Sequence, residues 1–215
     1  MIILFDLDGT LINTGEGITR SVRYALEKMG IEENDQRKLQ RFIGPPLLDS
    51  FQREYGFTEE QAKQAITFYR ERYQDIGLWE SELYPDVENT LQILKEQGHT
   101  LAVASSKPEQ FCKKLLEHFK IADYFTMIGG ATMDGKVNTK IEVLEYVLAA
   151  LKIKDRKNVV LVGDTKYDAE GARKAGISCI GITYGFEQDL AAMEAEGTVA
   201  VLDTLPQVAK RIENF

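Results

Sequence analysis

Five short apolar runs, separated by stretches of helical periodicity, constrain the fold of this chain more than any other feature. The runs cover residues 2–5, 100–104, 125–128, 159–162 and 178–182. Runs that are this short, and apolar at successive positions, are typical of parallel strands covered on both faces. Their alternation with helical patterns predicts an α/β fold with a doubly wound, Rossmann-like parallel sheet.

The helical patterns between these runs carry their own boundary signals. Val87, Leu91 and Leu94 repeat at helical spacing before a stop at Gly98. The apolar stripe that starts at Ile141 is preceded by Thr139, with Glu142 three residues later. This spacing is a capping-box pattern, so it predicts that a helix begins at about residue 139.

Residues 15–82 break the alternation of strands and helices. A crossover between parallel strands needs only a dozen or so residues including its helix, and this stretch is several times longer. Ile18, Val22 and Leu26 share one helical face, and Ala62 and Tyr69 share another. The sequence predicts a helical cap domain over 15–82, inserted into an α/β core formed by 1–14 and 83–215. The alternative is a long crossover that packs on the sheet.

Composition excludes several classes of protein. A net charge of -8 and a pI of about 5.0 argue against binding to a nucleic-acid backbone. Cys112 and Cys179 are too few for a disulfide framework, and the start of the chain is neither a signal peptide nor a membrane span. We therefore expect a soluble cytoplasmic protein without a membrane or nucleic-acid partner. The sequence does not decide between a monomer and a homodimer.

Polar residues follow three of the predicted strands. Asp6 and Asp8 follow the first, Ser105 follows the second, and Asp164 and Asp168 follow the fourth. Ligands of open α/β sheets bind at the carboxyl ends of the strands, so we expect these side chains to converge.

Two carboxylates one residue apart would repel each other unless a cation lies between them. A hard ion such as Mg²⁺ suits the pair Asp6 and Asp8, and Gly9 permits the turn that lets both face one pocket. One carboxylate could then attack phosphorus while the other moves protons. An ordinary turn explains Asp-x-Asp-Gly-Thr less well, because its chance occurrence together with the later Gly163-Asp164-x-x-x-Asp168 is on the order of 1 in 10,000.

With these motifs the sequence resembles the haloacid dehalogenase superfamily over essentially its whole length. The four segments of the resemblance are Asp6-Leu7-Asp8-Gly9-Thr10, Ser105, Lys140 and Gly163-Asp164-Thr165-Lys166-Tyr167-Asp168. The helical insert looks like the cap of this superfamily. Phe42-Ile43-Gly44-Pro45-Pro46 and Ser105-Ser106-Lys107-Pro108 look most like phosphoglycolate phosphatase-like and 5'-nucleotidase-like members.

The resemblance implies a Mg²⁺-dependent phosphatase that acts on a small phosphorylated metabolite through an aspartyl-phosphate. It makes Asp6 the nucleophile and Asp8 the general acid/base, and it assigns Asp6, Asp164 and the backbone carbonyl of Asp8 to the metal. Asp168 would orient Lys140 or support the metal site. The phosphate-binding residues that it implies are Thr10, Ser105, Ser106 and Lys140.

Several alternatives stay open at this point. Lys136 competes with Lys140, although Lys140 falls in the first turn of its helix, where the positive end favours an anion. Lys107 and Lys166 can be read as solvated surface lysines, Lys166 more readily. A phosphotransferase or sugar-phosphate mutase would share every core motif, and a non-catalytic regulatory module would share the fold. The sequence does not choose between phosphoglycolate and nucleoside monophosphates.

Overall fold

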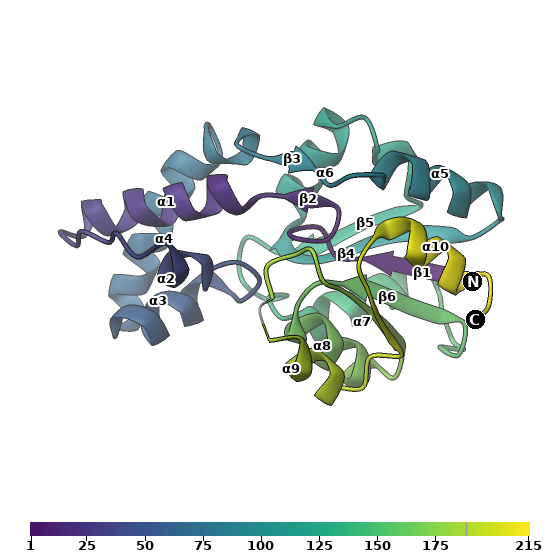
Figure 1. Ribbon diagram of the computed structural model, residues 1–215. Coiled ribbons are helices and arrows are strands. Elements are labelled where there is room, and N and C mark those ends of the chain that lie inside the picture. Colours follow the sequence, from purple (N-terminus) through teal and green to yellow (C-terminus); the bar gives the residue numbers. More distant parts are fainter. Residues whose placement is uncertain (188) are drawn as a thin grey trace. The chain divides into compact units, whose positions relative to one another are not determined.

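The computed structural model describes residues 1–187 and 189–215 (Figure 1). The chain divides into a core unit, residues 1–12 and 83–215, and an insert unit, residues 13–82. Within the described residues, the core contains a sheet of six strands in the order β5-β4-β1-β6-β7-β8. Every pair of neighbouring strands is parallel. The predicted doubly wound α/β class is confirmed.

Five of the six described strands overlap the predicted apolar runs, although β4 extends beyond its run at 100–104 and β5 is shifted from its run at 125–128. The strands are β1 (Ile2–Phe5), β4 (Thr100–Pro108), β5 (Met127–Ala131), β6 (Val159–Gly163), β7 (Ser178–Ile182) and β8 (Ala200–Leu202). Ile2 of β1 pairs with Thr100 of β4 on one side and with Val159 of β6 on the other. The strand that precedes Asp6 therefore lies inside the sheet, between β4, which contains Ser105, and β6, which precedes Asp164.

Helices cover the sheet on its two sides. They are α5 (Val87–Glu96), α6 (Glu109–His118), α7 (Lys140–Ala150), α8 (Lys166–Ala175), α9 (Leu190–Ala195), α10 (Leu205–Ile212) and the short η2 (Ala122–Tyr124). On one face, the apolar side chains of α7 and α8 pack with Leu4, Ala102 and Leu161. The helices α5 and α10 contact each other and lie toward the other side (Figure 1).

The capping box predicted at Thr139 is present. The Thr139 side chain accepts a hydrogen bond from the backbone N–H of Glu142, and the Glu142 side chain accepts bonds from the N–H groups of Asn138 and Thr139. The helix α7 consequently begins at Lys140, which fixes that lysine in its first turn.

The insert unit is all-helical apart from its ends, where β2 (Ile12–Asn13) pairs with β3 (Glu82–Leu83). Its helices are α1 (Gly15–Lys28), α2 (Gln36–Gln40), α3 (Leu47–Tyr55), α4 (Glu59–Tyr73) and η1 (Gly77–Trp79). The predicted apolar stripes of α1 and α4 are buried. Gly17 lies so close to the backbone of Gly77 that a Cβ would meet its carbonyl oxygen. An N-terminal helical insertion is therefore part of the fold, as predicted.

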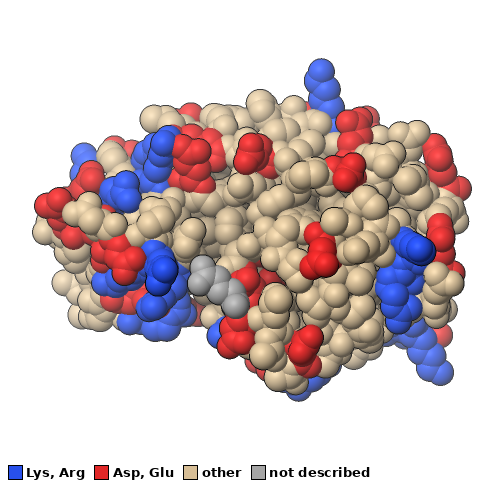
Figure 2. All heavy atoms as spheres, in the orientation of Figure 1, with Lys and Arg blue, Asp and Glu red and all other residues tan. Residues whose placement is uncertain are grey.

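Charged side chains pair locally on the surface. Figure 2 shows Lys and Arg side chains lying among Asp and Glu side chains on the face that it draws. In the insert, Arg72 lies 2.7 Å from Glu80, and Arg41 lies 3.1 Å from Glu54. Across the described residues, no helix combines the length and the apolar character that crossing a bilayer requires.

Candidate active site

The central strand β1 delivers Asp6 to the carboxyl edge of the sheet. The Asp6 backbone N–H still follows the sheet, donating to the carbonyl oxygen of Val162 at 2.9 Å. On the neighbouring strand β6, Asp164 follows Gly163 directly. Both carboxylates are buried, Asp164 completely. The parallel register thus brings together two acids that are far apart in the sequence, as we expected.

Lys140 joins this pair from the start of α7. Its Nζ lies 2.5 Å from Asp6 Oδ1, 2.7 Å from Asp168 Oδ1 and 2.9 Å from the carbonyl oxygen of Ala104. The competing Lys136 is 84% exposed in its side chain and pairs with Asp134 at 2.9 Å. Of these two lysines, the structure brings Lys140 to the predicted nucleophile.

The helix α8 holds Lys140 in place. Asp168 Oδ2 accepts hydrogen bonds from the backbone N–H and the hydroxyl of Thr165, which leaves Oδ1 toward Lys140. The stem of Lys140 crosses α8 at Gly171, where an added Cβ would lie 2.5 Å from Lys140 Cγ. Asp168 therefore contacts Lys140, and Gly171 provides the space for its stem. The sequence pattern identified Asp168, but it gave no reason to select Gly171.

Asp164 is fixed from several directions. Its Oδ1 accepts from the Thr10 hydroxyl at 3.1 Å, and its Oδ2 accepts from the backbone N–H of Phe186 at 2.8 Å. A Cβ on Gly9 or on Gly185 would lie within 2.3 Å of Asp164 Oδ2. The two glycines, one of them at a φ of 87°, leave only enough room for this carboxylate. Thr10 is fully buried, and its hydroxyl faces Asp164.

The burial of these charges shifts their pKa values. Burial raises the pKa of Asp6 to about 6; Lys140 opposes this rise, and the Asp168 carboxylate adds to it. Burial and the neighbouring acids Asp168 and Asp6 raise the pKa of Asp164 well above its usual range. Burial alone would lower the pKa of Lys140, but Asp168 and Asp6 outweigh it and raise that pKa. Excess negative charge at this edge therefore favours a proton or an added cation.

The donor set suits a hard divalent ion. Carboxylate oxygens of Asp6, Asp164 and Asp168 lie within 4.8 Å of one another, and all three residues are buried. Oxygen ligands of this kind are the ones that Mg²⁺ takes. The Asp8 carboxylate is not part of this cluster, so a contribution from Asp8 would come from its backbone carbonyl.

Asp8 pairs instead with Lys107, for which the sequence left a solvated surface position open. Lys107 Nζ lies 2.9 Å from both Asp8 Oδ1 and Asp8 Oδ2, and the lysine side chain is only 4% exposed. The surface interpretation of Lys107 is wrong because β4 continues to Pro108, beyond the apolar run that ends at Ala104. Two-residue spacing along this extension from the buried Ser105 was the signal that could have identified it.

The remaining predicted residues occupy different surroundings. Ser105 is buried, and its hydroxyl accepts from the backbone N–H of Lys107 at 3.3 Å. Ser106 is partly exposed. Lys166 is exposed, with its Nζ 5.6 Å from the centroid of the Tyr167 ring, in keeping with the surface interpretation.

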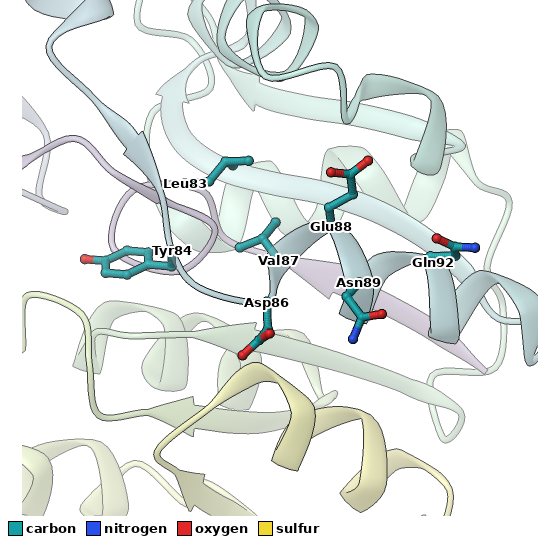
Figure 3. A pocket seen from close by; sticks show the side chains of 7 residues that line it. All are labelled: Leu83, Tyr84, Asp86, Val87, Glu88, Asn89 and Gln92. Carbon is teal, nitrogen blue, oxygen red and sulfur yellow. The ribbon is translucent and has the colours of Figure 1, made fainter.

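A separate hollow lies where the chain enters α5 (Figure 3). It has a volume of about 410 Å³ and is lined by Leu83, Tyr84, Asp86, Val87, Glu88, Asn89 and Gln92. None of the predicted catalytic residues lines it. We therefore place the candidate site at the buried acids and Lys140.

Comparison with known proteins identifies the family. The sequence profile of the haloacid dehalogenase-like hydrolases matches residues 3–182. The chain belongs to this family. A 5'-nucleotidase of Pseudomonas aeruginosa is 41% identical over 96% of this chain and 94% of its own length. Phosphoglycolate phosphatase 1 of the same organism is 30% identical over 95% of this chain and 76% of its own length.

Two further similarities complete the comparison. The tyrosine-protein kinase PtkA of Mycobacterium tuberculosis is 35% identical over 86% of this chain and 62% of its own length. The crystal structure of a predicted phosphatase from Clostridium acetobutylicum superimposes with a TM-score of 0.94, at 41% identity, over 100% of this chain and 98% of that one. The predicted class, a hydrolase of this family with phosphatase relatives, is confirmed.

Proposed function

We propose that the protein is a Mg²⁺-dependent phosphatase that hydrolyses small phosphomonoesters through an aspartyl-phosphate at Asp6. The observation that carries the proposal is the contact of Lys140 Nζ with Asp6 Oδ1, at a carboxyl edge that also holds Asp164. A nucleophile, a cation and further buried acids at one point are the parts that phosphoryl transfer requires.

In the first half of the reaction, an Asp6 carboxylate oxygen forms a bond to phosphorus as the bond from phosphorus to the ester oxygen breaks. Asp8 gives its proton to the departing alkoxide, so the alcohol leaves neutral. Lys140, Ser105 and the partly exposed Ser106 supply positive charge and hydrogen bonds to the phosphoryl oxygens.

In the second half, water attacks phosphorus and the bond from phosphorus to the Asp6 oxygen breaks. Asp8, now a carboxylate, removes the proton from the water. Inorganic phosphate leaves, and Asp6 and Asp8 return to their starting states. The same side chain thus serves as acid and then as base.

Asp6, Asp164 and the backbone carbonyl of Asp8 would hold Mg²⁺, and the bound ion would supply positive charge that neutralises the phosphate. The direction of the Asp164 carboxylate is fixed by hydrogen bonds from Thr10 and Phe186 and by the close approach of Gly9 and Gly185. These residues would therefore prepare Asp164 to bind the ion. Asp168 contributes by orienting Lys140 rather than by touching phosphate.

For the substrate, we propose a nucleoside monophosphate as the first candidate and phosphoglycolate as the second. The 5'-nucleotidase and phosphoglycolate phosphatase relatives support these choices. Release of inorganic phosphate should be measured over a panel of nucleoside monophosphates, phosphoglycolate and sugar phosphates, with Mg²⁺ and with EDTA. Undiminished phosphate release in EDTA would contradict the metal role.

The PtkA relative supports a second candidate, a phosphotransferase that passes the phosphoryl group from Asp6 to a hydroxyl acceptor. The two functions differ in the fate of the phosphoryl group. A radiolabelled substrate incubated with the protein and with tyrosine-containing peptides should yield free phosphate under our proposal. Label that appears in peptide instead would favour the phosphotransferase.

The covalent step has its own test. Asp6→Asn should abolish both turnover and the labelled, hydroxylamine-sensitive phosphoenzyme trapped by rapid acid quenching. The exposed Asp123 offers a matched control, because Asp123→Asn makes the same chemical change far from the site in the sequence. Turnover in Asp6→Asn that approaches the wild-type rate would refute the aspartyl-phosphate.

A further inference from the structure

We propose that Lys107 is a positioning residue for Asp8, holding the general acid/base in the orientation that proton transfer needs. This inference rests on the proposed function, because it assigns a task to the group that would move protons in that reaction. It adds a residue that acts on catalysis through another side chain.

The pair is symmetric and largely buried. Lys107 Nζ lies at the same 2.9 Å from each Asp8 oxygen, so the ammonium straddles the carboxylate rather than contacting one corner of it. The exposed fractions are 4% for the Lys107 side chain and 12% for that of Asp8. The surface pair Lys113–Glu109 is different, with 51% and 26% exposed. Charges removed from water in this way attract each other more strongly than surface charges do.

The Lys107 backbone is held firmly. Its N–H donates to the Ser105 hydroxyl at 3.3 Å, and its carbonyl oxygen accepts from Cys112 Sγ at 3.5 Å. The chain packs against Gly130 so closely that a Cβ there would lie 2.6 Å from the Lys107 carbonyl oxygen. Lys107 is therefore a fixed point on β4 from which Asp8, in the turn after β1, is oriented.

A two-point contact of this kind leaves the proton-transfer capacity of Asp8 intact. Each carboxylate oxygen has two lone pairs, so one remains for a proton after the lysine contact. What Lys107 restricts is rotation of the carboxylate. Proton transfer requires heavy atoms within hydrogen-bond reach, so a freely rotating Asp8 would spend less time in the productive orientation.

The first experiment varies the leaving group. Lys107→Met should reduce kcat/KM for an alkyl phosphate by about 10²-fold, the usual contribution of general acid catalysis. The same variant should lose much less in the first turnover of p-nitrophenyl phosphate, because nitrophenolate leaves without a proton. A rapid-quench burst of nitrophenolate would report that first turnover. Lys113→Met, which removes an exposed lysine, is the control and should leave both reactions unchanged.

The second experiment asks whether Lys107 acts only through Asp8. If it does, Lys107→Met should cost little more in the Asp8→Asn background than Asp8→Asn costs alone. A lysine that contacts the phosphoryl group directly would instead lower the rate by the same factor in both backgrounds. If Lys107→Met lowered the rate by the same factor in the wild-type and the Asp8→Asn backgrounds, the proposal would therefore be overturned.

The alkyl-phosphate rate and the p-nitrophenyl phosphate burst of a second variant, Lys107→Arg, separate a positioning role from a loss of folded structure. Lys107→Arg keeps the charge in a different shape, and it should restore part of the alkyl-phosphate rate while leaving the p-nitrophenyl phosphate burst near normal. If Lys107→Met does not fold, the ratio of the two rates in Lys107→Arg decides. An equal loss with both leaving groups, or no loss with either, would refute the positioning role.

Failure of the proposed function would look different. A wild-type protein that releases no phosphate, or an active Asp6→Asn variant, would contradict the phosphatase. An active wild type with an inactive Asp6→Asn and a normal Lys107→Met would contradict only the role of Lys107.

Discussion

Replacing Lys140 with methionine would remove the cation that contacts both Asp6 and Asp168 while keeping a side chain of similar length. At the observed 2.5 and 2.7 Å, each pair contributes about 6 kcal/mol of attraction at an effective dielectric constant of about 20, before the cost of desolvation. The net loss on breaking a buried pair is about 3 to 5 kcal/mol. We expect the metal-free variant to unfold at a urea concentration lower by roughly 1 to 3 M.

The same substitution should also slow catalysis. Loss of one group that stabilises the transferring phosphoryl costs about 10²- to 10³-fold in kcat. Without Lys140 the pKa of Asp6 should also rise above about 6, so more of the nucleophile is protonated near neutral pH. Steady-state kinetics with excess Mg²⁺ would measure the first effect, and a pH series would measure the second.

Lys136→Met is the matched control. It removes a lysine whose side chain is 84% exposed and pairs with Asp134, so both the urea midpoint and kcat should stay near wild type. Lys140→Arg should be little more active than Lys140→Met, because a planar guanidinium does not replace a compact ammonium in this space. An inactive Lys136→Met beside an active Lys140→Met would refute the reasoning.

Three more outcomes follow from the same geometry. Asp8→Asn should bind Mg²⁺ yet lose about 10²-fold or more in kcat, whereas Asp6→Asn should be inactive; equal residual activity would remove the distinction between their roles. Gly9→Ala should weaken Mg²⁺ binding about tenfold or more, measured by thermal shift, because a Cβ there meets Asp164. Gly30→Ala controls for backbone strain, since Gly30 has a similar positive φ but open space around it. If both substitutions weakened Mg²⁺ binding equally, the contact between the Cβ added at Gly9 and Asp164 would not be the cause. In metal-free protein, the pKa of Asp6 is raised from 3.8 to about 6, so the stability contributed by its proton is present below about pH 4 and lost as the pH rises through about 6. The urea midpoint of wild type relative to Asp6→Asn should therefore fall between about pH 4 and about pH 7, and an opposite slope would contradict the shift.

The periodicity of the sequence predicted most of the core. Four of the five apolar runs are strands that are buried over most of their length, and a short-range pattern of apolar residues reveals such strands. The run at 125–128 is less exact, because β5 covers Met127–Ala131 and its buried part is Gly129–Ala131. The strand β8 was not predicted, since Ala200–Leu202 is short and only partly buried. The capping box at Thr139 was readable from two residues, and it placed Lys140 in the first turn of α7.

The surroundings of the site were less accessible from the sequence. Phe186 reaches Asp164 through a loop whose path depends on β7 and on packing, and no local pattern encodes that path. Gly171 and Gly185 matter only because particular side chains pass over them in three dimensions. The sequence left the position of Lys107 undecided because the run of apolar residues ends before the strand does.

The position of β1 inside the sheet has a consequence for the order in which the protein is made. Ile2 pairs with Thr100 and with Val159, so β1 is synthesised before both of its neighbours and gains the second of them only when residue 159 has been made. The insert, residues 13–82, is continuous in sequence and can form its helices while the first strand is still unpaired. During that interval the apolar strand that precedes Asp6 lacks the neighbouring strands with which it pairs. Chaperone demand during synthesis should therefore fall sharply once β6 has emerged.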